Sequence, residues 1–164
     1  MATFGFKKSV DDIKPAVLLP EDWYTVEILE DPTLQDNAKK RDGASQEDGA
    51  GENLVIAVAV QDDTPEYSGR RFTIYLPWPN DLDEEVYTGG GQLKADAKMA
   101  RIAKAVESFG GSVDGEQFVL SVGMAAKVYV VQEMDNRNEG EIRNSLDVFR
   151  SGFRSAKPIE TTPY

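Results

Sequence analysis

Residues 69–81 read GRRFTIYLPWPND, and their pattern decides the type of fold. Between the two arginines and the first proline, apolar side chains alternate with polar ones, which predicts a β-strand over residues 70–77 with one buried face. The expected core-facing side chains are Phe72, Ile74 and Leu76, and the outward-facing ones are Arg71, Thr73 and Tyr75. The strand ends where Trp78 stands between two prolines, which cannot donate to a sheet ladder.

Four other segments also have strand character, namely residues 23–28, 53–61, 125–133 and 141–150. In the first, alternate apolar positions predict one buried face. The second, NLVIAVAVQ, is apolar at both parities, which predicts a central strand that is buried on both faces. The predicted core from these strands includes Tyr24, Val26, Ile28, Leu54, Ile56, Val128, Val130, Ile142, Leu146 and Val148.

One helix is expected after the third strand, within QLKADAKMARIAKAVESFGG, residues 92–111. Apolar side chains recur there at helical spacing, and Gly110-Gly111 is a stop signal. The spaced apolar residues are Met99, Ile102, Ala103, Val106 and Phe109. Residues 112–122 fit neither a helical nor a strand period clearly.

The order of elements is three strands, one helix and two strands, which predicts a mainly β protein with an OB-fold-like, five-stranded Greek-key barrel. Residues 31–52 are poor in large apolar side chains and are expected to form a long mobile loop. The expected organisation is an N-terminal arm at 1–15, an OB-like domain at 16–150 and a C-terminal tail at 151–164.

The composition restricts the possible functions. The chain of 164 residues has neither histidine nor cysteine, and no metal site or cofactor is expected. Disulfides are excluded, and the usual acid–base, nucleophilic and metal-ligand groups are missing, so we expect a protein that is not an enzyme. The formal net charge of -11 is concentrated in residues 30–52 and 81–85. A local basic surface elsewhere remains compatible with this acidic total.

The outward positions of three predicted strands each combine a cation with an aromatic ring. These pairs are Arg71 with Tyr75, Lys127 with Tyr129, and Arg143 with Phe149. A cation near a phosphate and a ring under a base are what single-stranded nucleic acid requires, and each stacked base contributes about 1–3 kcal/mol. Trp78, held between prolines, is a further candidate for stacking, and Arg70 for phosphate. The alternative is that the tyrosines are cross-strand partners and Trp78 covers one end of the barrel.

The predicted helix carries a second row of cations, in which Lys94, Lys98, Arg101 and Lys104 share one side. Such a row can bind phosphates, and we include the first three as candidate phosphate ligands. A solvated helix face is the other explanation, and it is the more common one.

Several segments, taken in order, resemble those of phage-encoded single-stranded DNA-binding proteins catalogued as a domain of unknown function. The matching segments are LLPEDWYTVEI, GRRFTIYL, KMARIAKAVESFGG, KVYVVQE and RNSLDVFR, within residues 16–150. The resemblance implies an OB fold and a role in coating single strands during phage replication or recombination, in the cytoplasm of an infected bacterium. It also implies binding roles for Arg70, Arg71, Arg143 and Asn144. Asp22 stands where the family usually has glycine, and the end of the chain lacks the acidic character of many such proteins.

The partners expected on this basis are single-stranded DNA and replication or recombination proteins, with no membrane association and with a homodimer formed through exposed strand edges. A phage structural protein or an inhibitor of a host factor, without nucleic-acid binding, is the first alternative. A hydrolase that uses carboxylates and a metal ion is the second, although no coherent carboxylate motif supports it.

Overall fold

The computed structural model describes residues 1–12, 17–36, 51–135, 137 and 140–156 of the chain. These described residues are mainly β, with one α-helix, α1 (Lys94–Ser108), and two short 3-10 helices, η1 (Val10–Asp12) and η3 (Asp81–Glu84). The strands are β1 (Asp22–Ile28), β2 (Thr33–Asp36), β3 (Glu52–Gln61), β4 (Arg71–Pro77), β5 (Ser112–Asp114), β6 (Gln117–Val119), β7 (Ala125–Met134), β8 (Ile142–Leu146) and β9 (Phe153–Ser155).

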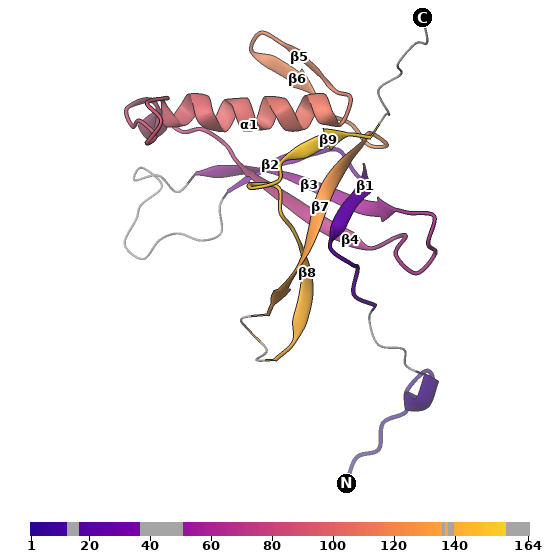
Figure 1. The fold of residues 1–164 in the computed structure, drawn as a ribbon. Coiled ribbons are helices and arrows are strands. Elements are labelled where there is room, and N and C mark those ends of the chain that lie inside the picture. The colour runs from indigo at the N-terminus through magenta and orange to yellow at the C-terminus, as the bar shows by residue number, and fades with distance from the viewer. Residues whose placement is uncertain (13–16, 37–50, 136, 138–139, 157–164) are drawn as a thin grey trace, which may run out of the picture.

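Seven of these strands form one strongly curled antiparallel sheet (Figure 1). Strand β3 pairs with β4 along one edge and with β2 and β1 in succession along the other. Strand β1 also pairs with β7, which in turn pairs with β8 and β9. The registers of β8 and β9 run in the same direction along β7, so the two form one strand that is interrupted by residues 147–152.

Alternation along the long strands places one side of the sheet in a common core, as the sequence predicts for β1 and β4. In β1 the side chains of Tyr24, Val26 and Ile28 are buried, and in β4 those of Ile74 and Leu76 are buried. The prediction that β3 is buried on both faces is wrong. Its core face is buried, but the residues facing the other way are half-exposed, because no element of the described chain covers that side of β3. Those half-exposed residues include Val55, Ala57 and Ala59.

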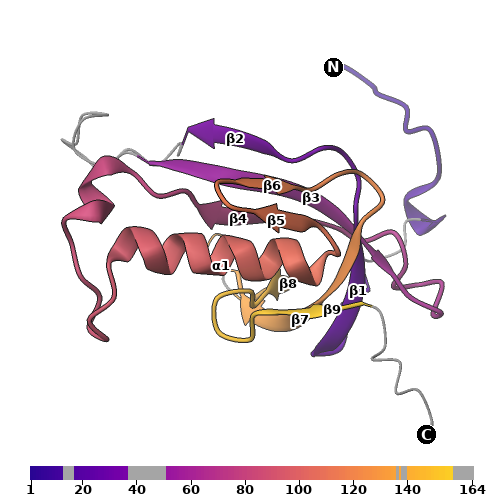
Figure 2. The same ribbon diagram turned by 90° about the horizontal axis from the view of Figure 1, so that it is seen from above.

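Helix α1 lies along one side of the curled sheet and closes the core there (Figure 2). Its buried residues Ile102 and Val106, with Phe109 just after it, join the same hydrophobic cluster as the sheet residues. Met99, by contrast, is 40% exposed, so the apolar stripe predicted from the sequence is wider than the contact surface. Phe109 packs against Phe153 of β9, with ring centroids 6.0 Å apart.

The helix ends where the sequence predicts, at Gly110-Gly111. The N–H of Gly111 donates to the carbonyl of Val106 at 2.9 Å, and Gly110 has a φ of 82°, as in a Schellman-type C-cap. A Cβ at Gly111 would lie 2.2 Å from the carbonyl oxygen of Val119, so only glycine fits. The chain then turns directly into the β5–β6 hairpin, which occupies part of the segment whose pattern was ambiguous.

Three features of the sheet differ from the sequence prediction. Strand β2 lies within the predicted loop 31–52, of which residues 37–50 are outside the described part. Strand β9 lies within the predicted tail, where Phe153 is buried. Ile142 was expected in the core but is 53% exposed. It pairs with Met134 on the β7–β8 hairpin, which projects from the rest of the sheet, so neither side chain reaches the core (Figure 1).

Candidate nucleic-acid interface

A cluster of two aromatic rings and two cations occupies the outer face of β1, β7 and β9. Trp23 lies opposite Tyr129 in the β1–β7 register, and Lys127 lies opposite Arg154 in the β7–β9 register. The two rings meet edge to face at 5.6 Å, and the Arg154 guanidinium lies 4.0 Å from the centre of the Trp23 ring. Lys127 is exposed two residues before Tyr129 on the same face of β7. We call these four residues the Trp23 cluster.

The chemistry of the Trp23 cluster suits a ligand that has both rings and negative charge. Aromatic faces stack on planar groups, and the Arg154 guanidinium lies over one face of the Trp23 ring, which puts a positive charge within the same cluster. Sequence reasoning assigned Lys127 and Tyr129 to this face but missed the other two. The alternation of β1 already directs Trp23 outward, so its position could have been found, whereas Arg154 belongs to a three-residue strand without a recognisable pattern.

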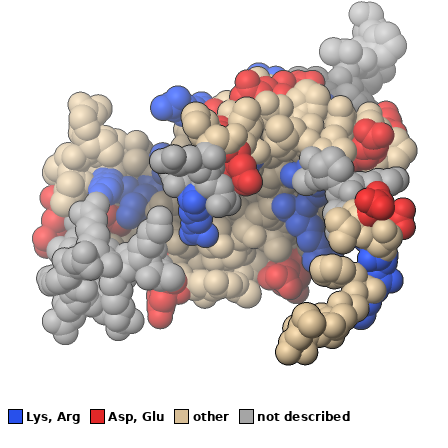
Figure 3. Space-filling view, turned by 90° about the horizontal axis from the view of Figure 1, so that it is seen from below, with Lys and Arg blue, Asp and Glu red and all other residues tan. Residues whose placement is uncertain are grey.

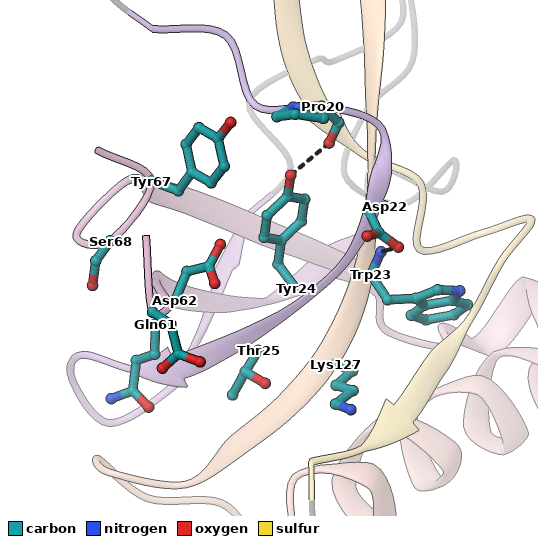
Figure 4. Close-up of a pocket in the computed structure, with 11 residues that line it drawn as sticks. Pro20, Asp22, Trp23, Tyr24, Thr25, Gln61, Asp62, Tyr67, Ser68 and Lys127 are labelled. Carbon is teal, nitrogen blue, oxygen red and sulfur yellow. Dashed lines mark hydrogen bonds between the residues drawn. The ribbon is translucent and has the colours of Figure 1, made fainter. Parts of the chain in front are cut away.

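Beside the cluster lies a cavity of about 820 Å³, shown in Figure 4. Lys127 and Trp23 are among its lining residues, and so are three carboxylates, from Asp22, Asp62 and Asp63. Such a set of charges repels an anion, so this cavity is not a site for phosphate. It limits the cationic surface to the part of the face near β9.

Tyr24, at the wall of this cavity, is tied to the chain before β1, because its hydroxyl donates to the carbonyl of Pro20 at 2.7 Å (Figure 4). Burial, together with the nearby Tyr67, Asp22 and Asp62, raises the pKa of Tyr24, so its phenol stays neutral and serves as a structural donor.

A second group of predicted residues meets where β4 approaches β8. Tyr75 and Phe149 are 54% and 55% exposed, and both line a cavity of about 410 Å³ together with Arg143. The Arg101 guanidinium lies 4.9 Å from the centre of the Phe149 ring, so one cation of α1 does reach the predicted aromatic set. Arg143 forms an ion pair with Glu133 at 3.0 Å, and both partners are about half exposed.

Arg71 is exposed on the outer face of β4, and it has no ion-pair partner among the described residues. Its neighbour Arg70 instead turns to the N-terminal segment and donates a hydrogen bond to the carbonyl of Val17. The two adjacent arginines therefore differ in role: Arg70 fastens the chain before β1, and Arg71 is available to a ligand.

Lys94 and Lys98 are placed in a structural ion-pair cluster with Asp83 of η3. The Lys98 ammonium lies 2.6 Å from the Asp83 carboxylate, and that of Lys94 lies 3.9 Å from it. Lys98 is only 17% exposed along its side chain and Asp83 is 4% exposed, so the closer pair is largely shielded from solvent. The cluster fixes the start of α1 against η3 and occupies Lys98 of the predicted cationic row, whereas Lys94 is half exposed and Arg101 is exposed.

Opposing effects act on the Asp83 carboxyl, and the result is a lowered pKa. Burial alone raises the pKa, but the hydrogen bond from Lys98, that from the N–H of Asn80, and the charges of Lys98 and Lys94 outweigh burial. Asp83 therefore stays ionised at neutral pH and keeps Lys98 in place.

Trp78 and Asn144 also have packing roles. Trp78 is half-buried, with its ring 5.9 Å from that of Phe118 on β6, and it packs against the hydrophobic core. Asn144 accepts from the N–H of Leu19 at 2.8 Å and donates to the Leu19 carbonyl at 2.9 Å, which fastens the segment before β1 to β8. Leu19 is fully buried, so this bridge explains why a polar residue interrupts the apolar alternation of β8.

Positive charge on the face shown in Figure 3 is distributed in separate groups. On the face in Figure 3, Lys and Arg form several groups around an uncharged central area, with Asp and Glu between them. No group of three or more metal-ligating side chains that could hold an ion lies within the described residues. In that same part of the chain, no helix is long and apolar enough to cross a membrane. Comparison of the sequence with models of known protein families and with curated proteins finds no match to either.

Proposed function

We propose that this protein binds single-stranded DNA without strong sequence preference, on an OB-like barrel. The order of the long strands supports the fold assignment, since β4, β3, β1, β7 and then β8 with β9 follow one another around the curl. An OB fold has five strands in a partly open Greek-key barrel, and it binds oligonucleotides with the face of its second and third strands and two neighbouring loops. In this assignment β8 and β9 together are the fifth strand, and α1 lies between the third and the fourth.

The observation that carries the proposal is the Trp23 cluster, in which two rings and two cations share one outer face. Single strands expose base faces and phosphates together, and proteins bind them by stacking combined with charge. Trp23 and Tyr129 would stack bases, while Lys127 and Arg154 would neutralise the adjacent phosphates. Arg71 would extend the phosphate path across the sheet.

The resemblance to phage single-stranded DNA-binding proteins suggests in which biological process this activity would be used. The protein would coat and protect single strands during replication or recombination in the infected bacterium, alongside other replication proteins and as a homodimer. The cations on the face in Figure 3 lie in separate groups, which suits sequence-tolerant binding to a flexible single strand. A stiff duplex has regularly spaced phosphates and favours a continuous basic surface.

Tryptophan fluorescence tests the proposal directly, because Trp23 and Trp78 are the only two tryptophans. In a Trp78→Phe variant the signal comes from Trp23 alone, and titration with unlabelled oligothymidine at low salt should quench it to saturation. Added salt should reverse the quenching. The matched Trp23→Phe variant, which keeps the half-buried Trp78, should show a much smaller change.

Absence of quenching in the Trp78→Phe variant, with no shift of a labelled oligonucleotide in a gel, would refute DNA binding. The cluster would then be a cross-strand packing arrangement, and the role without nucleic acid, as a structural or host-factor-binding protein, would take its place.

A further inference from the structure

The curled sheet is open between β4 and β8. These strands are the two ends of the long-strand order, and they approach each other without pairing. The N–H of Trp78 donates to the carbonyl of Glu52, and the N–H of Val60 donates to the carbonyl of Arg70, both at 2.8 Å. The even-numbered residues of β4 are therefore the ones bonded to β3. Because antiparallel ladders alternate, the main-chain groups of the odd-numbered residues point into the opening. These residues are Arg71, Thr73 and Tyr75.

Strand β8 offers the same kind of edge from the other side. The N–H of Asp147 donates to Tyr129 at 2.9 Å, and that of Asp135 donates to Glu141 at 2.8 Å, which makes the odd-numbered residues of β8 the ones bonded to β7. The main-chain groups that point into the opening are then those of Ile142, Asn144 and Leu146. Two rows of donors and acceptors therefore face each other, and no strand of the described residues pairs with either row.

Between these rows lies the cavity of about 410 Å³, within the size range of small-molecule sites. Its buried floor includes Ile74 and Val148. Tyr75 and Phe149, each slightly more than half exposed, form aromatic walls. The cavity thus combines apolar and aromatic surface with a few directed polar groups, which is how sites for planar ring ligands are built.

The charges around this cavity favour an anionic ligand. None of its lining residues is a carboxylate, while Arg143 lines it and Arg101 lies over the outer side of Phe149. Glu133 neutralises part of the Arg143 charge. By contrast, the 820 Å³ cavity described above is lined by three aspartates, and a third cavity of about 420 Å³ is lined by Asp36, Glu52 and Asp81.

The spacing of the strands excludes a peptide strand as the occupant. Neighbouring strands lie about 4.8 Å apart, so an inserted strand would need β4 and β8 to be about 10 Å apart along their length. Instead, Cα atoms of β4 and β8 come within 8 Å of each other. A flat ring that enters edge-on fits this narrowing space.

We propose that this cavity takes one unstacked nucleobase from a bound single strand, an inference that rests on the proposed DNA binding. The base stacks on Tyr75 or Phe149, and its hydrogen-bonding edge meets the free main-chain groups of β4 and β8. The adjoining phosphate lies near Arg143 and Arg101. Bound DNA is thereby anchored at one nucleotide, away from the Trp23 cluster.

A substitution that fills the cavity tests this inference. Thr73 is exposed, lies on the cavity wall and is readily replaced in a strand by an aromatic residue, so Thr73→Phe should block the space without loss of a core contact. Ser112→Phe on β5, an exposed strand position remote from the opening, is the matched control. Each variant and the wild type are titrated with labelled oligothymidine and with an abasic oligonucleotide of the same length, and thermal unfolding confirms that each is folded.

For Thr73→Phe we expect affinity for oligothymidine to fall about 5-fold to 150-fold, the equivalent of about 1–3 kcal/mol for one stacked base, with affinity for the abasic strand unchanged. Ser112→Phe should leave both affinities unchanged. Unchanged binding of oligothymidine by Thr73→Phe, or an equal loss on both strands, overturns the nucleobase site while DNA binding stands. A wild type that does not bind oligothymidine overturns both proposals.

Discussion

Removing the two cations of the Trp23 cluster should flatten the salt dependence of DNA binding by a calculable amount. Lys127→Gln and Arg154→Gln together delete two positive charges that lie opposite each other in the β7–β9 register, while they keep polar side chains of similar reach. On single strands, each neutralised phosphate contributes about 0.7 to the slope of log K against log salt, so the double variant should lose about 1.4 from that slope.

The same number gives the expected loss of affinity. If the binding curves of wild type and double variant converge near 1 M salt, a slope difference of about 1.4 corresponds to about 25-fold weaker binding at ~0.1 M, or about 1.9 kcal/mol. Fluorescence anisotropy of a labelled oligothymidine, measured at several salt concentrations, provides both the slope and the affinity.

A control separates local contacts from the net charge of the protein. Lys104→Gln removes one charge from the exposed side of α1, outside both candidate binding surfaces, and should leave the slope unchanged. An unaltered slope in the Lys127→Gln, Arg154→Gln variant would refute the assignment of phosphates to this face. An equal change in the control would mean that only long-range charge is involved.

Three further predictions concern stability, measured by urea unfolding. Asp83→Asn should lower the free energy of unfolding by about 1.5–3 kcal/mol at pH 7, the range for a hydrogen bond to a charged group. Because the folded-state pKa of Asp83 is lowered, wild type should lose this contribution as pH falls below about 4 toward that pKa, and a difference that does not shrink on acidification would contradict the reasoning. Gly111→Ala should cost about 1–3 kcal/mol through its clash with β6, whereas Gly89→Ala, with open space around it, should cost less than about 0.5 kcal/mol; equal effects would contradict the packing argument. Asn144→Leu should cost about 1–3 kcal/mol because the buried N–H of Leu19 loses its acceptor, and an unchanged unfolding midpoint would show that the bridge is dispensable.

The sequence predicts the elements whose pattern repeats over several residues. The alternation in residues 71–77 and the helical spacing before Gly110-Gly111 both correspond to observed burial. In each case one face of a single regular element packs against the core, so the local sequence period follows the burial. Parity also places Arg71 and Tyr75 correctly on the outer face. For these elements, local sequence and the curled sheet require the same arrangement.

Elements that depend on distant partners could not be predicted in this way. Strand β2 has four exposed residues and exists through main-chain pairing with β3, so it has no apolar period to detect. Strand β9 is only three residues long. The cation–π contact of Arg154 with Trp23 joins positions far apart in sequence, and parity cannot reveal such a pairing. Likewise, nothing in the helix pattern distinguishes Lys98, which is held by Asp83, from a free surface lysine.

The outer edge of β2, which pairs only with β3 among the described residues, has a consequence for aggregation in solution. Open strand edges are templates on which further copies of a chain can add, and such addition leads toward aggregates. Each copy of this protein has a formal net charge of -11, and like-charged copies repel one another over roughly a Debye length, about 10 Å at 0.1 M salt. High salt removes that repulsion at the same time as it releases a bound strand from the cationic groups. Concentrated protein should therefore remain soluble longest at low ionic strength, and DNA-free protein at high salt concentration should be the form most prone to precipitate.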